Sequence, residues 1–413
     1  MKLSKKIIKP EARAFPIKVA LFSNGPDLPT GYAKVIREIG VRLNQDERFK
    51  VVFYNENYMG LDTEFLGIPV KPLYPITRNV TDIAQKFVNT IQEDRPDVVI
   101  FLEDSFTLKN MGFKNIIKTP CKRIFYIPLD GEWLPTTGID ICRSMDKLVS
   151  MANFTQQELA KDGFDSTVIW HGVDLELFQP VNEQKQKELK KKYGFNKNDF
   201  VLYNYGRNSM RKNNQSLIDS SFAYLKDAPK NHKVFLHIMN KDSEDSNLSD
   251  FVNRHMVYKY GKELIESNRL CFSNFEKDRP ATDQEMAEMI QLSDLIISTS
   301  SGEGFGLIMA EGMACAKPIV HTNYTTPEEL LLDTSKGIGL RGWAIPYSTK
   351  ITSSFNTTHA FINTDEFVKT IKEAVSNPEE LKNRGFNGRK FAFKYLNWDY
   401  LVEEWKETIL NTL

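Results

Sequence analysis

Apolar runs that suit β-strands alternate with segments of helical periodicity along almost the whole chain, and this alternation limits the folds it can adopt. Residues 97–102 (DVVIFL) and 123–129 (RIFYIPL) are apolar throughout after their first residue, as parallel strands covered on both faces are. Residues 31–44 instead repeat their apolar side chains at helical spacing. The pattern therefore predicts an α/β fold with doubly wound parallel sheets.

The alternation occurs twice, with a break between the two series. Residues 182–197 (NEQKQKELKKKYGFNK) are polar and basic, and a new strand is predicted directly after them at 200–205. A length of 413 residues also suits two or three domains at ~150 residues each. We expect two Rossmann-like domains that face a cleft, with boundaries at 1–175 and 176–392, followed by a closing helical segment at 393–413.

The charge balance and the apolar pattern restrict the partners and the location of the protein. The 54 basic and 54 acidic residues cancel, whereas a general nucleic-acid binder carries a basic excess, so a nucleic-acid partner is disfavoured. No apolar run approaches the ~18–20 residues that cross a bilayer, which favours a cytoplasmic protein. The basic start leaves peripheral contact with an anionic membrane open. We expect the four scattered cysteines to be reduced residues: Cys121, Cys142, Cys271 and Cys315.

The sharpest motif spans residues 298–317, which read STSSGEGFGLIMAEGMACAK. A buried strand, a glycine-rich turn and a helix over 305–316 are predicted there. Gly304 and Gly306 let the backbone pass close to a ligand, and the free N–H groups of a helix start favour phosphate. Glycines are common in such turns, so their spacing alone is weak evidence for a phosphate site.

Two carboxylates strengthen the phosphate interpretation. Glu311 is the only charge in the predicted apolar helix, and a buried carboxylate is costly without a partner. It would lie ~9 Å along the helix axis from the phosphate end, which suits ribose hydroxyls, while Glu303 in the turn would lie beside an attached sugar. The structural alternative is that Glu311 pairs with a buried arginine and that Glu303 is a solvated turn residue.

A nicotinamide dinucleotide fits this motif less well. A dinucleotide fingerprint needs an acidic residue roughly 20 positions on, at the end of the next strand. Here the predicted strand 318–321 is followed by Thr322, Asn323 and Tyr324, and the first acidic residue is Glu328.

Three further segments place polar groups at the ends of predicted strands, where ligands bind in such sheets. Arg207, Arg211 and Lys212 follow strand 200–205 and suit a diphosphate. Gly31 opens a helix after the first strand, and Asp130 follows the buried run 123–129. Each is weak alone, since a turn residue explains it equally well. No Asp-x-Asp pair occurs and the six histidines lack ligand spacing, so we predict no required metal and no cofactor.

Together these motifs resemble the retaining GT-B glycosyltransferases, the large E-x7-E family known as glycosyltransferase family 4 or glycosyl transferases group 1. The signature E-G-F-G-x4-E corresponds to Glu303 through Glu311. The interdomain pattern G-V-D-x3-F-x-P corresponds to residues 172–180, and the G-R…K motif to Arg207 and Lys212.

The resemblance implies a role for each matching residue. Arg207 and Lys212 would bind the donor diphosphate, and Glu311 would hold the ribose. Glu303 and the backbone of Gly304, Phe305, Gly306 and Leu307 would hold the sugar. Gly31 would line the opposite wall of the cleft, and the closing helix would cross back to the N-terminal domain. Many members have a histidine where this chain has Asp130, which leaves the identity of the sugar open.

The resemblance also implies an activity. It is the transfer of a hexose-type sugar from a nucleoside-diphosphate sugar to an acceptor hydroxyl, with retention, in carbohydrate biosynthesis. The acceptor would be a sugar, a lipid-linked glycan or a protein. Two alternatives remain: a GT-B sugar-nucleotide epimerase, which needs no acceptor, and a non-catalytic bilobal sugar-binding protein.

Overall fold

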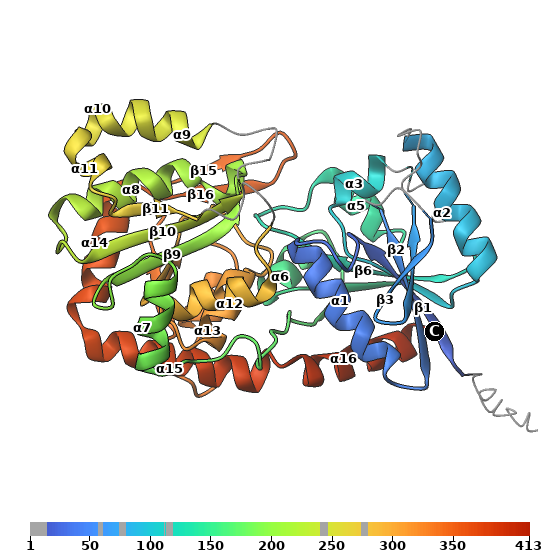
Figure 1. Ribbon diagram of the computed structural model, residues 1–413. Coiled ribbons are helices and arrows are strands. Elements are labelled where there is room, and N and C mark those ends of the chain that lie inside the picture. The colour runs from blue at the N-terminus through green and yellow to red at the C-terminus, as the bar shows by residue number, and fades with distance from the viewer. Residues whose placement is uncertain are drawn as a thin grey trace, which may run out of the picture.

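The protein forms two α/β lobes that lie side by side (Figure 1). The computed structural model describes residues 15–56, 61–73, 80–110, 112, 119–239, 247–273 and 280–413. The basic N-terminal segment, on which the predicted membrane contact depends, lies outside these residues. No helix of the described part combines the length and apolar character needed to cross a membrane.

The N-terminal lobe is built around an eight-stranded sheet of order β3-β4-β2-β1-β5-β6-β7-β8. All neighbours in it pair in parallel except β3 and β4. Its strands are β1 (Ile17–Ser23), β2 (Phe49–Asn55), β3 (Thr63–Phe65), β4 (Ile68–Pro72), β5 (Val98–Phe101), β6 (Lys122–Ile127), β7 (Lys147–Ser150) and β8 (Thr167–Val168). Its helices are α1 (Gly31–Asn44), α2 (Val80–Asp94), α3 (Ser105–Asn110), α5 (Thr136–Cys142) and α6 (Asn153–Lys161).

The strand β1 shows why these runs are apolar on both faces. Val19 and Leu21 belong to one buried cluster, which includes Ile36 of α1. Ala20 and Phe22 point the other way, into the cluster that holds residues of α2. Both faces of the sheet are therefore covered, as the uninterrupted apolar runs predicted.

The C-terminal lobe contains a six-stranded parallel sheet of order β11-β10-β9-β12-β13-β14. Its strands are β9 (Phe200–Arg207), β10 (His232–Met239), β11 (Leu270–Phe272), β12 (Leu295–Ser298), β13 (Ile319–Thr322) and β14 (Gly342–Ile345), and β15 (Thr349–Thr352) with β16 (Thr358–Phe361) forms a separate hairpin. The helices are α7 (Glu183–Lys192), α8 (Asn214–Asp227), α9 (Leu248–Asp250), α10 (Val257–Tyr260), α11 (Lys262–Glu266), α12 (Asp283–Leu292), α13 (Leu307–Ala314), α14 (Thr364–Ser376) and α15 (Pro378–Tyr395), with short π-helical turns at Phe251–Met256 and Glu328–Leu332.

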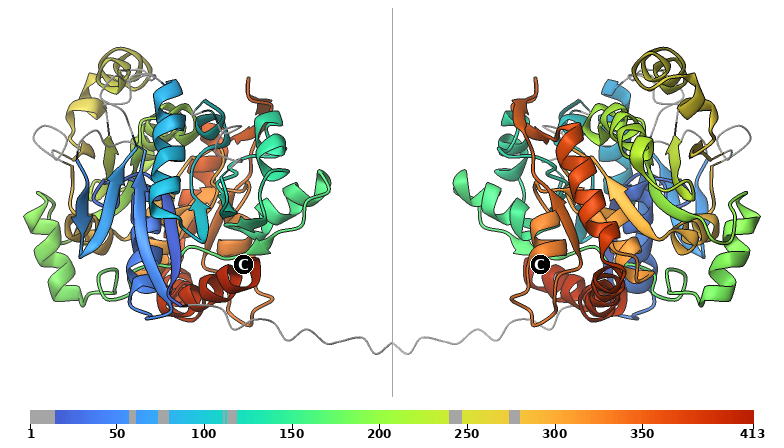
Figure 2. Two further views of the ribbon diagram at one scale, coloured as in Figure 1. Left: turned by 90° about the vertical axis from the view of Figure 1, so that its right-hand side faces the viewer. Right: turned by 90° about the vertical axis from the view of Figure 1, so that its left-hand side faces the viewer.

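The last helix, α16 (Trp398–Thr412), returns to the N-terminal lobe and packs along its base (Figures 1 and 2). Trp405 is fully buried there, and its ring meets that of Tyr126 edge-on with 4.9 Å between centroids. At the crossing, a Cβ atom on Gly172 would lie 2.4 Å from the Trp398 ring, so glycine permits this close approach. The predicted return of the chain is confirmed, while the domain boundaries at 175 and 392 stay predictions.

The structure corrects several predicted elements. The polar segment 182–197 contains helix α7, and the predicted closing segment 393–413 contains the end of α15 and the whole of α16. The sequence of residues 248–266 predicts one helix, but the structure has shorter pieces there, and the chain leaves helical geometry at Gly261, whose φ is 84°. The helix predicted over 305–316 spans only 307–314. It starts late because Gly306, with φ of 93°, lies outside helical geometry.

Candidate functional site

The loop between β12 and α13 lies at the centre of the candidate site, and hydrogen bonds from neighbouring segments fix its backbone. The N–H of Glu303 donates to Thr325 Oγ1 at 3.0 Å. The N–H of Ser301 donates to the carbonyl oxygen of Arg211 at 2.8 Å. Gly306 then opens α13, and a Cβ atom there would lie 2.3 Å from Met309 Cε. These contacts therefore hold the glycine-rich turn in one defined conformation.

Four charged side chains meet at this loop and link the two lobes. Lys212 Nζ lies 2.6 Å from Glu303 Oε1, and Arg211 Nη1 lies 3.0 Å from Glu303 Oε2. Arg211 Nε also contacts Asp130 Oδ2, in the other lobe, at 2.7 Å. Arg211 thus forms an ion pair with one carboxylate of each lobe. The Glu303 side chain is almost completely buried.

The cations of this network favour the ionised forms of its two carboxylates. Burial by itself would raise the pKa of Glu303, but Lys212 and Arg211 hold that pKa well below its usual range. Burial opposes the charge of Asp130 in the same way, and Arg211 with His359 lowers the pKa of Asp130. Burial lowers the pKa of Lys212, although Glu303 acts against this effect. The two cations therefore stabilise the negative charges of the two buried carboxylates.

Glu311 is buried and paired, as a lone carboxylate in an apolar helix requires. Only 1% of its surface is exposed, and its Oε1 accepts a hydrogen bond from Lys34 Nζ at 2.6 Å. The hydroxyl of Tyr205 donates to its other oxygen. The partner is thus a lysine of α1 in the other lobe, where the alternative had considered an arginine. Because α13 begins at Leu307, Glu311 lies ~6 Å along the axis from the helix start, closer than predicted.

Most of the remaining predicted residues also lie where the two lobes meet. A Cβ atom on Gly31 would lie 3.3 Å from Leu307 Cδ1, and one on Gly304 would lie 3.5 Å from the Leu129 carbonyl oxygen. Phe305 is buried and stacks against His171, with 4.7 Å between ring centroids. Arg207 ends β9 with its side chain exposed, and its predicted contact with a diphosphate stays a prediction.

Three residues of the site were not singled out from the sequence. Lys34 lies within the helix predicted over 31–44, but nothing in that pattern shows that it reaches the other lobe. Tyr205 reads as an ordinary strand residue. His359 lies 3.3 Å from Asp130 Oδ1 through its Nε2 atom, and it belongs to a hairpin that the apolar pattern did not predict.

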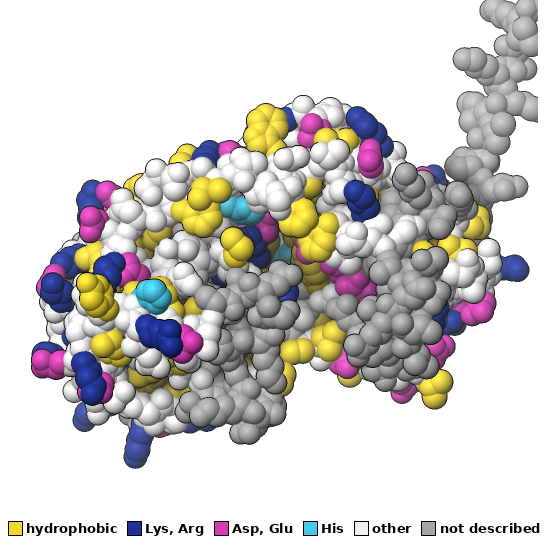
Figure 3. Space-filling view, turned by 90° about the horizontal axis from the view of Figure 1, so that it is seen from above, with side chains coloured by type: hydrophobic (Ala, Val, Ile, Leu, Met, Phe, Trp, Pro, Cys, Tyr) yellow, Lys and Arg dark blue, Asp and Glu magenta, His cyan; other side chains and the backbone are white. Residues whose placement is uncertain are grey.

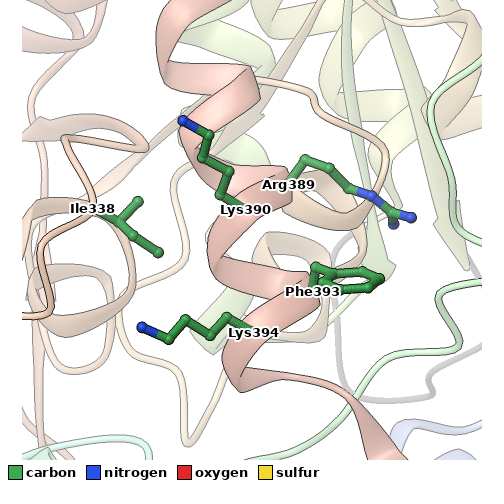
Figure 4. Close-up of a pocket in the computed structure, with 5 residues that line it drawn as sticks. All are labelled: Ile338, Arg389, Lys390, Phe393 and Lys394. Carbon is green, nitrogen blue, oxygen red and sulfur yellow. The ribbon is translucent and has the colours of Figure 1, made fainter.

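Outside this loop, the described surface and its cavities show fewer features that could bind a ligand. Seen from above, charged side chains of both signs lie between the two lobes with hydrophobic side chains around them (Figure 3). A cavity of about 20 Å³ between the lobes includes Lys34 and Glu311. A hollow of about 420 Å³ on α15 involves none of the predicted residues, and Figure 4 shows its lining: Ile338, Arg389, Lys390, Phe393 and Lys394. The described residues contain no group of three or more His, Cys, Asp or Glu side chains that could hold a metal ion.

Residues 185–346 match the family model of glycosyl transferases group 1. EpsD of Bacillus subtilis, which is named as a glycosyltransferase, is 26% identical over 224 residues, or 54% of this chain and 49% of EpsD. The chain thus spans about half the length of that relative.

Solved structures resemble the chain over nearly its whole length. Sucrose-phosphate synthase from Thermosynechococcus elongatus has a TM-score of 0.73 at 14% identity, covering 96% of this chain and 98% of its own. HepE from Anabaena, in complex with UDP and glucose, has a TM-score of 0.70 at 17% identity, covering 96% and 100%. The chain therefore has the GT-B fold, and the comparisons together support a GT-B glycosyltransferase family.

Proposed function

We propose that this protein is a glycosyltransferase that moves a hexose-type sugar from a nucleoside-diphosphate sugar to an acceptor hydroxyl with retention of configuration. The observation that carries the proposal is the glycine-rich turn into α13. There a buried Glu303, paired with Arg211 and Lys212, precedes a buried Glu311. The resemblance of the fold to HepE, whose structure contains UDP and glucose, agrees with such a donor.

In this proposal the donor lies along the start of α13. The diphosphate faces the free N–H groups of the helix and the side chains of Lys212 and Arg207. The ribose hydroxyls donate hydrogen bonds to the Glu311 carboxylate. This carboxylate either keeps its ion pair with Lys34 as well or gives up that ion pair for the ribose. The sugar lies beside Glu303 and Asp130.

The reaction breaks the bond between the anomeric carbon and the diphosphate oxygen, through an oxocarbenium-like state. The bonding electrons leave with the nucleoside diphosphate, and Arg207 and Lys212 stabilise the negative charge that it gains. The acceptor oxygen then bonds to the anomeric carbon from the same face. Its proton passes to the departing phosphate, so no side-chain base is needed.

The acceptor would enter from the N-terminal lobe and would be a sugar, a lipid-linked glycan or a protein. A group of acidic residues lies on that side. Tyr32 donates a hydrogen bond to Asp104 at 2.9 Å, and Asn24 donates to Glu56 at 3.0 Å. Carboxylates in such positions can accept hydrogen bonds from the hydroxyl groups of an acceptor.

Incubation with labelled UDP-, GDP- and ADP-sugars, first without and then with a mixture of acceptors, tests this proposal. We expect slow hydrolysis of one donor without acceptor and a glycosylated product with it, whose anomeric configuration NMR shows to match the donor. A product of inverted configuration would contradict retention. An isomerised sugar would show an epimerase, and an unchanged but bound sugar would show a binding protein.

A further inference from the structure

A β-hairpin of the C-terminal lobe, formed by β15 and β16, reaches the N-terminal lobe beside the candidate site. Glu132, just after β6, exchanges two backbone hydrogen bonds with Thr358 of β16. The N–H of Glu132 donates at 3.1 Å, and that of Thr358 donates in return at 2.9 Å. Lys350 of β15 adds an ion pair with the Glu132 carboxylate at 2.5 Å. The hairpin is thus tied to the segment that carries Asp130.

Two more contacts fix the hairpin on both sides of the site. The N–H of Ala360 donates to the carbonyl oxygen of Ser301, in the glycine-rich loop, at 2.9 Å. At the hairpin tip, the ring of Phe355 stacks on that of Phe106 in α3, with 5.6 Å between centroids. The hairpin therefore holds the loop of one lobe and the strand end of the other at the same time.

Glycines allow these backbones to meet. A Cβ atom on Gly131 would lie 2.4 Å from the carbonyl oxygen of Thr358, and one on Gly302 would lie 1.8 Å from that of Asp130. Both distances are shorter than non-bonded atoms tolerate, and both neighbours are backbone atoms that cannot rotate away. The approach of the hairpin and the loop to residues 130–132 therefore depends on glycine at both positions.

His359 of β16 reaches the carboxylate of Asp130. Its Nε2 atom lies 3.3 Å from Asp130 Oδ1, while Arg211 Nε holds Oδ2 at 2.7 Å. An ionised carboxylate only accepts hydrogen bonds, so Nε2 must carry the proton of this contact. Each oxygen of Asp130 is thus fixed by a different residue of the C-terminal lobe, and Arg211 continues to Glu303.

We propose that this hairpin is a strap that completes the sugar end of the site, and that His359 is a positioning residue. His359 orients Asp130 against Arg211, and Arg211 in turn orients Glu303. The proposal rests on the proposed function for what the site binds, but the strap itself is a contact between lobes that exists without any ligand. Loss of His359 should misplace the sugar and leave the nucleotide end of the site intact.

Kinetics of His359→Ala and His359→Gln test the positioning role, with His255→Ala, an exposed histidine of the same lobe, as the control. Since small misplacements cost ~100-fold in rate, we expect His359→Ala to lower kcat by ~100-fold. The KM for the accepted donor and the calorimetric affinity for its nucleoside diphosphate should change by less than ~3-fold. The amide N–H of His359→Gln can still donate to Asp130, so this variant should recover at least ~10-fold of that loss. Full turnover in His359→Ala would overturn the role, as would a loss of nucleoside-diphosphate affinity in parallel with kcat and without rescue by glutamine.

Hydrogen exchange without a ligand tests the strap independently of any activity. Amides of residues 128–134 and 349–361 should exchange slowly in the unsubstituted protein and faster in Gly131→Val, which blocks the approach of Thr358. Rapid exchange of both segments in the unsubstituted protein would overturn the strap. Slow exchange in a protein that neither binds nor turns over any sugar nucleotide would support the strap and contradict the proposed function instead.

Discussion

Arg211 has the most central position of the charged residues at the candidate site. It contacts Asp130 of one lobe and Glu303 of the other, and its Nη1 atom also donates to the carbonyl oxygen of Gly302 at 2.6 Å. The sequence shows three cations between residues 207 and 212, and the choice among them depends on the short 3-10 turn Met210–Lys212. The family motif selects Arg207 and Lys212, and spacing alone does not show the turn that brings Arg211 between the two carboxylates.

Lys212 gives the first prediction at this scale. Lys212→Ala removes a charge-assisted contact to the proposed leaving group, so kcat should fall by ~100–1000-fold, or ~3–4 kcal/mol. Steady-state kinetics with the preferred donor measure the effect, and Arg254→Ala, an exposed cation of the same lobe, is the control. Turnover of Lys212→Ala equal to that of the control would rule out this role.

Glu103 gives a second prediction, which concerns stability. Burial and the neighbouring Glu56 raise the pKa of Glu103 to about 9 in the folded protein. When folding raises the pKa of a carboxyl group, its contribution to stability is fully present at pH values below the pKa of the unfolded state. This contribution is lost as the pH rises toward the pKa of the folded state. Glu103→Gln should therefore match the unsubstituted protein near pH 4.5 and have a higher Tm at pH 8.5. Between these two pH values, each pH unit lowers the free energy of unfolding of the unsubstituted protein by up to about 1.4 kcal/mol.

Thermal unfolding of both proteins across this pH range measures the difference. Glu47→Gln, on the exposed surface of the same lobe, controls for the general effect of one charge. Parallel stability curves for Glu103→Gln and the unsubstituted protein would show that Glu103 ionises as easily folded as unfolded.

At the scale of elements, sequence predicts what is buried better than what is exposed. The buried central strands, such as β1, β5, β9 and β12, lie within a few residues of the predicted runs, whereas β3, β4 and β14 were not predicted. The strand β15 is exposed along its whole length, so it lacks the alternation on which prediction depends. Helix α15 contains Gly385 and Gly388, which lower helix propensity. The structure requires glycine at position 385, because a Cβ atom on Gly385 would lie 2.3 Å from the Ala316 carbonyl oxygen.

Helix α16 gives the prediction at this scale. Trp405 is fully buried between α16 and the N-terminal lobe, so Trp405→Ala should lower the free energy of unfolding by ~3–5 kcal/mol. Tyr400→Ala, on the same helix with 59% of the side chain exposed, should change it by less than ~0.5 kcal/mol. Chemical denaturation distinguishes the two. Equal effects would show that α16 is not held by its buried face.

At the scale of the whole molecule, the candidate site exists only where the lobes meet. Lys34 joins Glu311 across the lobes and Arg37 joins Asp283 at 2.7 Å, while Arg211 joins Asp130. The sequence predicted which loops would carry the site, because they follow predicted strands. It could not predict which side chains of the two lobes pair, because such contacts depend on how the lobes are placed and not on local pattern.

The whole site also leads to a prediction about metal. The proposed binding of the diphosphate uses cationic side chains and a helix start, so sugar transfer should continue after dialysis against EDTA. Turnover before and after dialysis measures this. Activity that is lost on chelation and restored by Mg²⁺ or Mn²⁺ would show that a metal ion binds the diphosphate.

The placement of the donor along α13 is the central claim, and calorimetric affinity for the nucleoside diphosphate tests it most directly in Glu311→Gln and Glu303→Gln. Glu311→Gln should weaken this affinity by ~1–3 kcal/mol because the ribose loses a charged partner. Lys34→Gln controls for the loss of the ion pair between the lobes and should keep the affinity. Glu303→Gln should lower kcat more than it weakens this affinity, since Glu303 faces the sugar. Weaker binding in Glu303→Gln with unchanged binding in Glu311→Gln would contradict the account, because the nucleotide would then lie in the opposite direction along the helix.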